Sequence, residues 1–377
     1  MTKMIKMSLI AAVAVTGMTS AVNAQNLEDA IKGVDVSGYV DYRLEKRASV
    51  TTPANDYNVN EYAVQVALKS KVNDQVTANV VIGFDEVQTD NTNSASTQTT
   101  ITTDANPSLT VINANFAAQL GSTTVIAGKQ NIPSVFVDKV DTVKTGAGVV
   151  VVQPVNGYLT LAAAHFMNNN IAADTKTSEL IAMGAIAGAN YALHYNKTDI
   201  VNAISDRMYA KVNTKVSGID LTGKYATTSN KVANSGHASV TQLIASGKIS
   251  DITLTGAYAK KKQDTANASD VAIDSDNDAE VNLKVWQLST DTYGTASGDV
   301  YALTASMPIM NNLTASYSYA SADVDGSTTK YTENLAQLTY KMSKNFTVHG
   351  RYSVLNKDTG SANTDTSMSR LQVKYTF

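Results

Sequence analysis

The chain has 377 residues and a formal net charge of −3, and it contains no cysteine. The lack of cysteine excludes thiolate metal sites, cysteine nucleophiles and a disulfide framework. The 30 lysine and arginine residues against 33 aspartate and glutamate residues argue against a basic surface for nucleic acid. Tyrosine supplies 18 of the aromatic residues and tryptophan only one, and a tyrosine ring suits a boundary between apolar material and water.

The first residues have the pattern of an export signal. Lys3 and Lys6 precede the apolar run 7–15, and small residues suited to cleavage end at Ala24. The run is too short for a membrane helix, which needs about 20 apolar residues. Residues 1–24 are therefore predicted to be a cleaved signal peptide, whose removal changes the formal charge from −3 to −5. Since no other apolar run is long enough, any membrane residence of 25–377 must use strands.

From residue 34 onward the sequence alternates between apolar and polar residues. Side chains of a strand alternate between its two faces, so this period predicts strands that are apolar on one side only. The pattern is clear at both ends of the region. Near the start, Val34, Val36, Val40, Tyr42 and Leu44 share one face, opposite Asp35, Ser37, Asp41, Arg43 and Glu45; near the end, Leu371, Val373, Tyr375 and Phe377 oppose Arg370, Gln372, Lys374 and Thr376.

Short turns and long polar loops alternate along the chain. We expect eight short turns, near residues 72–75, 121–122, 154–156, 187–189, 217–218, 246–250, 308–312 and 343–345. The clearest long loops are expected at 88–106, 131–146, 168–176, 197–205, 228–235, 262–298, 321–331 and 356–366. Such a rhythm is typical of a transmembrane antiparallel β-barrel with short periplasmic turns and long extracellular loops. The count predicts 18 strands; 16 strands, or a further strand at 280–288, are the alternatives.

A soluble β-sandwich is the competing fold. It would have to bury polar positions such as Asp41, Arg43, Lys211 and Arg370 between its two sheets. In a barrel embedded in lipid, the apolar face meets hydrocarbon and the charged face lines water. Aromatic residues near strand ends also fit the girdles of such a barrel at the two membrane interfaces. We therefore predict an all-β transmembrane barrel over residues 25–377.

Two short stretches resemble known outer-membrane proteins. Leu27–Gly38 (LEDAIKGVDVSG) resembles the mature N-terminus of Campylobacter-type major outer membrane porins. Lys374–Phe377 is similar to the closing strand of outer-membrane proteins generally, which end in an aromatic residue. The resemblance implies a homotrimeric passive channel in the Gram-negative outer membrane, open to ions and small hydrophilic solutes, with outer-membrane lipid around it.

The loop at about 131–146 is the expected constriction. In porins the resembling loop folds into the barrel, and Asp138 and Asp141 could then face the pore, with Lys139 and Lys144 nearby. Rings of charged side chains are a basis of ion preference. Basic residues interpreted as lying on the polar face opposite them are Arg43, Lys69, Lys129, Lys211, Lys224, Arg351 and Arg370.

Other signals are weaker. Residues 274–280 have the opening spacing of a calcium loop but lack its glycine and its glutamate, so a solvated acidic loop is expected and the sequence leaves weak calcium binding open. No metal site and no cofactor are predicted. No serine, histidine and carboxylate are placed for nucleophilic catalysis, so an enzyme is not expected. A surface adhesin or antigen is the main alternative function, and a barrel hydrolase the lesser one. The sequence leaves open whether the loop 262–298 plugs or caps the channel.

Overall fold

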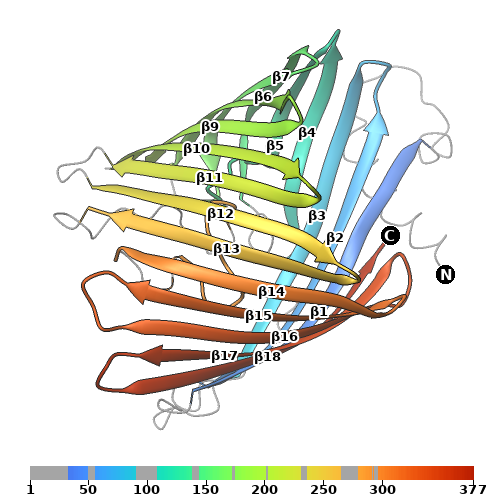
Figure 1. Cartoon of the computed structure of the whole chain (residues 1–377). Helices are drawn as coiled ribbons and strands as arrows, with labels where there is room; N and C mark the ends of the chain where they lie inside the picture. Colours follow the sequence, from blue (N-terminus) through green and yellow to red (C-terminus); the bar gives the residue numbers. More distant parts are fainter. Residues whose placement is uncertain are drawn as a thin grey trace.

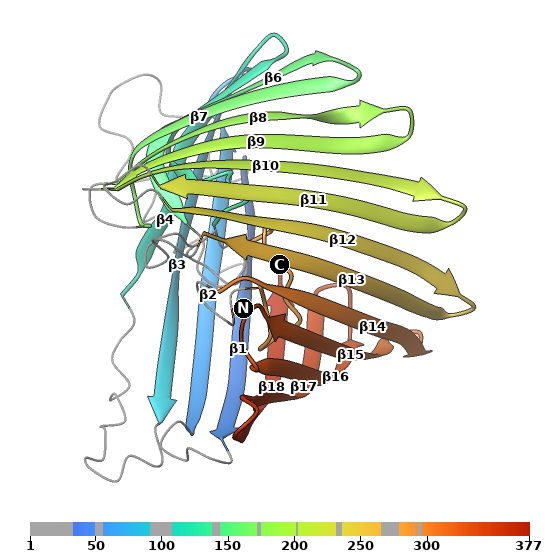
Figure 2. The same ribbon diagram turned by 60° about the vertical axis from the view of Figure 1, so that its left-hand side comes forward.

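The computed structural model describes residues 33–49, 56–90, 108–137, 144–171, 175–200, 203–230, 236–264, 279–290, 292 and 296–377. These residues form one closed antiparallel barrel of 18 strands (Figures 1 and 2). The predicted fold class and strand count are therefore confirmed. Within the same ranges, no helix is long and apolar enough to cross a membrane. The predicted signal peptide lies outside the described residues.

The strands are long and joined in sequence order, each pairing with its neighbours. Their bounds are β1 Val34–Ser49, β2 Tyr57–Lys71, β3 Val76–Asp90, β4 Thr110–Leu120, β5 Thr123–Asn131, β6 Thr145–Asn156, β7 Leu159–Asn169, β8 Lys176–Ile186, β9 Ala189–Ile200, β10 Ala203–Val216, β11 Ile219–Asn230, β12 His237–Ile249, β13 Ile252–Gln263, β14 Gly298–Met310, β15 Leu313–Val324, β16 Lys330–Lys341, β17 Phe346–Asp358 and β18 Asn363–Thr376. The alternative of a further strand at 280–288 is not what the structure shows: the described residues 279–290 hold only an isolated bridge between Lys284 and Ser289.

The barrel closes where β1 pairs with β18, and both views show the two strands side by side (Figures 1 and 2). The amide N–H groups of Gly38 and Phe377 each donate to the other residue's carbonyl at 3.0 Å. A Cβ atom at position 38 would lie 2.8 Å from the Phe377 ring and closer still to the backbone of Gln65. Glycine is therefore required where the terminal aromatic residue docks.

The eight predicted short turns are all present. Ala187–Gly188 and Ser217–Gly218 form two-residue turns in which all four residues have positive φ, between 50° and 85°. Such turns match the right-handed twist of the paired strands, and glycine tolerates the second position without strain. The opposite end of the barrel carries the longer connections, except between β9 and β10 and between β17 and β18.

One expected long loop is mostly strand. Residues 197–205 were expected to be a polar loop, but β9 continues to Ile200 and β10 resumes at Ala203. Lys197 is in register with Asp206, and Thr198 with Ser205. Lys197 and Asp199 on the outward face are 41% exposed, whereas Thr198 on the inward face is buried, so the ladder continues with polar residues on both faces. The connections at 321–331 and 356–366 are shortened in the same way, because β15 to β18 extend into them.

The outward face is apolar with aromatic residues near both ends. At the short-turn end the rings of Phe346, Tyr375 and Phe377 are neighbours, with centroids 6.5 and 6.1 Å apart. At the loop end Tyr258 lies 5.1 Å from Tyr301, and Tyr62 lies 5.9 Å from Phe84. These bands have the placement of the interfacial girdles of membrane barrels.

Candidate functional site

The inward face of the barrel carries the charges, and it divides into two unlike walls. One wall, over β16, β17, β18, β1 and β2, holds an arginine on three strands. We call Arg43, Arg351 and Arg370 the arginine wall. The other wall, over β11 to β15, presents small apolar side chains at the same inward positions. We call these the alanine floor: Ala226, Ala238, Ala259, Ala320 and Ala322.

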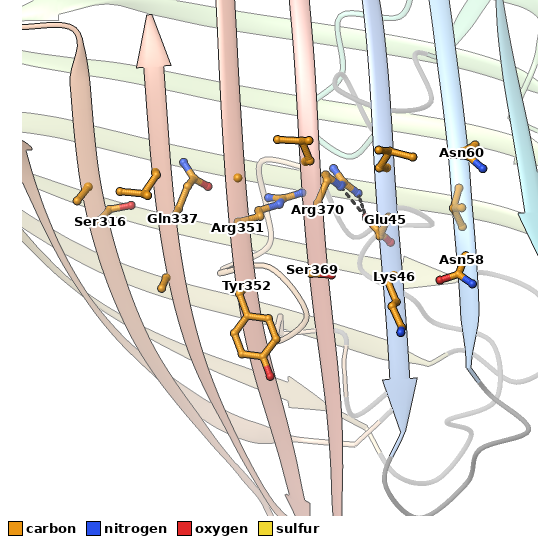
Figure 3. A pocket seen from close by; sticks show the side chains of 17 residues that line it. Glu45, Lys46, Asn58, Asn60, Ser316, Gln337, Arg351, Tyr352, Ser369 and Arg370 are labelled. Atoms are coloured by element: carbon orange, nitrogen blue, oxygen red, sulfur yellow. Dashed lines mark hydrogen bonds and ion pairs between the residues drawn. The ribbon is translucent and has the colours of Figure 1, made fainter.

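Carboxylates hold two arginines of the wall, Arg43 and Arg370, in place. Arg43 contacts Asp41 at 3.2 Å and Glu61 at 2.9 Å. Arg370 contacts Glu45 through two nitrogens, at 2.5 and 2.6 Å, across the seam between β18 and β1 (Figure 3). These are charge-assisted hydrogen bonds, which are short and fix the orientation of the guanidinium plane.

The alanine floor is covered, not open to water. All five alanines are at most 2% exposed, although they face the inside of a wide barrel. They belong to one buried cluster with Val281, Leu283 and Leu288, which come from the connection between β13 and β14. The cover is therefore the 279–290 segment, which lies inside the barrel.

The 279–290 segment is a compact turn with its own hydrogen bonds. The amide of Val285 donates to the carbonyl of Leu288 at 2.9 Å, and that of Thr290 donates to Leu283 at 3.0 Å. At one end of the segment, the Glu280 carboxylate accepts from the Lys211 ammonium at 2.8 Å and from the Tyr209 hydroxyl at 3.0 Å. This end is thereby fixed to β10.

Other contacts on the same side reinforce that anchor. The Lys224 ammonium on β11 donates to the backbone carbonyl of Glu280 at 3.1 Å, and the side-chain amide of Gln242 on β12 donates to the carbonyl of Val281. Burial opposes ionisation of Glu280, but the hydrogen bond and charge of Lys211, with smaller effects of Tyr209 and Lys224, hold the pKa of Glu280 below its usual range. Glu280 is therefore ionised at neutral pH.

The other end of the segment is fixed to β16 by Glu333, a fully buried carboxylate. Glu333 accepts from the amide N–H groups of Trp286 at 3.2 Å, Gln287 at 3.1 Å and Leu288 at 2.8 Å. It also accepts from the Ser353 hydroxyl at 2.7 Å. Successive amide groups of a turn form a concave anion site, and here a side chain of the wall fills it.

This anchoring places an aromatic ring over the arginine wall. The Arg351 guanidinium carbon lies 3.9 Å from the centroid of Trp286, and that of Arg370 lies 5.7 Å from it. Both distances are within the range of a cation–π contact. The segment therefore extends from β10 to the arginine wall along the inside of the barrel.

A second segment, 132–137, also lies inside. Ile132 and Val137 pack with Val150, Ala164 and Phe166 on the inward face of β6 and β7. Phe136 is fully buried, 5.6 Å beneath the Arg207 guanidinium carbon.

A polar network fixes this segment to β8 and β9. The Asn196 side-chain amide donates to Ser134 at 3.4 Å and to Glu179 at 2.5 Å. Glu179 also contacts the His194 ring at 3.1 Å. All of these groups are buried, and every contact is a hydrogen bond or a close polar pair. The network is a fixed support for the segment on its wall.

The two segments meet. Val135 and Phe136 belong to the same buried cluster as Val281, Leu283 and Leu288, together with Tyr209 of β10. Two connections that are far apart in the sequence thus share one hydrophobic contact inside the barrel. The open cross-section is reduced at this level.

The structure places the predicted basic residues unequally. Arg43 and Arg370 share one wall, as expected from barrel closure, and Arg351 is directly in register with Arg370. Lys69 also points inward, but it is eight residues along β2 from Glu61, the partner of Arg43, which is about 26 Å in a strand. Lys69 therefore lies near the short turns, away from the arginine wall.

The prediction that Lys129 lies on the polar, inward face of the barrel is wrong. Lys129 is in register with Ala114 and Ala147, whose row lies on the outward face, whereas its neighbour Gln130 faces inward and is 6% exposed. Its ammonium donates to the carbonyl of Val111 near the loop end. A lysine two residues from the end of a strand can reach water along its own stem, which is why the polar residue fits an outward position.

Three residues of the expected constriction, Asp138, Lys139 and Asp141, lie outside the described residues, as do most of 274–280. The sequence did not single out Glu333 or Trp286, which the structure brings together. Trp286 lies in the stretch 280–288, which the sequence offered only as an alternative further strand. Within the described ranges, no three histidine, aspartate or glutamate side chains gather in a way that would hold a metal ion.

Comparison with known proteins bears on this architecture. The profile of the family described as Campylobacter major outer membrane protein matches residues 2–307. No curated protein gives a match. Several solved structures are similar in fold. OccAB1 of Acinetobacter baumannii has a TM-score of 0.69 at 12% identity, covering 91% of this chain and 96% of that one.

Two solved structures from Pseudomonas aeruginosa are also similar in fold to this chain. OpdO has a TM-score of 0.66 at 15% identity, covering 93% of this chain and 98% of its own. OpdK, solved with vanillate, has a TM-score of 0.62 at 12% identity, with 91% and 98% covered. At such identities the similarity is one of fold.

Proposed function

Because this chain belongs to the Campylobacter major outer membrane protein family and is an outer-membrane porin, we propose that two inward connections form its constriction. These are the loop 131–146 and the 279–290 segment. The porin provides a water-filled channel for passive diffusion of small solutes, and it is not an enzyme. An 18-stranded barrel is wide enough to leave such a channel unless something narrows it.

The observation that carries the proposal is the buried cluster shared by the two connections. Phe136 and Leu288 are both fully buried inside the barrel. Each is fixed to a different wall, the first by the Asn196 network and the second by Glu333. Solutes pass through the space that this contact leaves.

The charges at the constriction determine which solutes pass. The arginine wall supplies positive charge on one side, and Asp138 and Asp141 supply negative charge from the loop 131–146, with Lys139 between them. Opposed charges create a field across the passage, which is a known basis of ion preference. Ions and small hydrophilic solutes are the expected cargo.

Labelling of single cysteines tests the placement, and the natural chain offers no competing thiol. Asp141→Cys and Lys284→Cys should each lose conductance in a planar bilayer when a charged thiol reagent is added. Ser361→Cys, in the turn between β17 and β18, is the matched control and should keep its conductance. If neither inner position responds, the constriction lies elsewhere.

The porin is a homotrimer within this proposal, in line with the resemblance of its N-terminus. Channel openings in a bilayer should then appear as three equal steps, and the native mass in mild detergent should be that of three chains. Single steps from a protein of monomer mass would contradict the trimer.

Export and membrane placement complete the proposal. Residues 1–24 are removed, so the mature N-terminus is Gln25, and the apolar outward face contacts outer-membrane lipid. N-terminal sequencing of the protein extracted from outer membranes checks the cleavage. A sequence that begins at Met1 would contradict it.

A further inference from the structure

Glu333 is a buried acid of the lumen whose only role so far is to fix the 279–290 segment to its wall. It is fully buried on β16, and four groups donate to it: three successive backbone amides and the Ser353 hydroxyl. A buried carboxylate is costly unless its charge is met by hydrogen bonds. The site is therefore built around the segment that supplies the three amides.

We propose that Glu333 is the positioning residue of this channel's selectivity. By holding the amides of Trp286, Gln287 and Leu288, it fixes the Trp286 ring over Arg351 and Arg370 and so determines how much of their positive charge solutes meet. The inference goes beyond the constriction proposed above, because it assigns the control of selectivity to a residue that solutes do not touch.

The contacts around Glu333 favour a fixed role over a chance contact. The Gln287 side chain donates to Ser353 at 2.7 Å and to the Thr366 carbonyl at 3.4 Å, which ties the same turn to β17 and β18. Leu288 is fully buried against the alanine floor, and Trp286 is 6% exposed. The small side chains of the floor leave room that only a resident segment fills.

The stacking explains the link to selectivity. Arg351 lies 3.9 Å from the ring centroid, so one face of its guanidinium group is covered by indole instead of water. Arg370 is 5.7 Å away and is paired with Glu45. If the turn moved away, both guanidinium groups would gain access to the lumen, and anions would be favoured.

The chain's only tryptophan reports directly on this arrangement, because no other residue contributes indole fluorescence. In Glu333→Ala, the emission of Trp286 should shift to longer wavelength and acrylamide should quench it more strongly. Loss of a hydrogen bond to a charged group should raise the undocked population at least about ten-fold. The same variant should show larger conductance and a reversal potential shifted toward anions.

A second set of variants separates the effect of the negative charge of residue 333 from the effect of its position. Glu333→Asp keeps the charge but draws the carboxylate back by one methylene, so it should shift fluorescence and conductance in the same direction as Glu333→Ala. Asp35→Asn removes an inward charge near the short turns, and it should leave the fluorescence of Trp286 unchanged. Trp286→Ala should reproduce the shift toward anions without a change of formal charge.

Every variant is first checked for heat-modifiable migration, which shows a folded barrel. If Glu333→Ala does not fold, Ser353→Ala removes a single donor and gives the same readouts in milder form. An unchanged Trp286 emission in a folded Glu333 variant overturns the proposal. So does a shifted emission with wild-type conductance and reversal potential, because the segment would then lie outside the path of the ions.

Discussion

The alanine floor and the arginine wall occupy the same kind of position on the same barrel, yet they have opposite chemistry. Both consist of inward side chains at strand positions that alternate with lipid-facing ones. The floor is apolar and at most 2% exposed, whereas the wall is charged, with Arg43 paired with Glu61 and Arg370 with Glu45. The comparison teaches that a side chain on the inward face of a barrel is not always in contact with water. Whether the inward residues are apolar or charged tells whether another segment covers them.

The largest expected effect comes from making the floor resemble the wall. Ala322, which is fully buried, is in register with Val300 and Tyr331. Ala322→Asp would place a carboxyl group there without a partner, at a cost of at least about 1–3 kcal/mol even in its neutral form. We expect loss of the folded, heat-modifiable species at lower urea concentrations in vesicles.

The control for this change is Ser316→Asp, at an inward and half-buried position of the same strand. It should leave the urea transition close to that of the wild type. Equal stability of Ala322→Asp and wild type would show that the floor is open to water and that the 279–290 segment does not cover it.

A smaller effect, on selectivity only, is expected at the loop that faces the wall. The Asp138→Asn, Asp141→Asn double variant removes negative charge from the proposed constriction and should shift permeability toward anions. Field lines concentrate in a narrow passage with low-dielectric walls, so the shift should exceed that of a distant charge. It should grow at low salt, where the Debye length is about 30 Å at 0.01 M.

Reversal potentials under a salt gradient measure this shift. Asp325→Asn, in the exposed turn between β15 and β16, is the control for a general change of charge and should have little effect. Identical reversal potentials in the double variant and the wild type would place residues 131–146 outside the constriction.

A third prediction concerns acid. The pKa of Glu280 is lowered in the folded protein, so its ionised form contributes stability above the ordinary glutamate pKa of about 4.3. That contribution is lost only as the pH falls through the lowered folded value. Conductance and Trp286 fluorescence should therefore be constant from pH 7 to 5, with the anchor to Lys211 released at lower pH.

Glu280→Gln should lack this acid transition. Fluorescence and conductance titrations from pH 7 to 3 on both proteins make the comparison. An acid transition that persists unchanged in Glu280→Gln would contradict the assignment, because it would come from another titratable group.

The strand count and the two faces were predictable because they follow from local alternation. Val40, Tyr42 and Leu44 alternate with Asp41 and Arg43, and no distant residue is needed to infer that they point in opposite directions. The same reasoning was wrong for Lys129, since its polarity was given more weight than its place in an outward row.

The inner segments were predictable only in part. The loop 131–146 was predicted to fold inward, and its apolar residues Ile132 and Phe136 are indeed buried. The contact between Glu333 and the amide of Trp286 joins residues 47 positions apart, and no local sequence pattern predicts it. A run of inward alanines along adjacent strands was the one available signal, because a water-filled lumen has no need of them.

The smallest expected effect lies above the membrane, where β9 and β10 extend beyond their expected ends. Lys197 and Asp199 are 3.5 Å apart and both are 41% exposed, so water screens the pair. Lys197→Ala should change the free energy of unfolding by less than about 0.5 kcal/mol. Arg370 and Glu45 offer the contrasting pair, at 2.5 Å with exposures of 14% and 11%.

Glu45→Ala would leave Arg370 without this carboxylate at the seam of the barrel, so it should destabilise the protein more than Lys197→Ala does. Losing a charged hydrogen bond costs about 1.5–3 kcal/mol where water does not replace the partner. Urea transitions of both variants in vesicles of the same lipid measure the difference. Equal shifts would mean that water reaches the arginine wall as freely as it reaches the β9–β10 hairpin. The 279–290 segment would then not shield Arg370 from water.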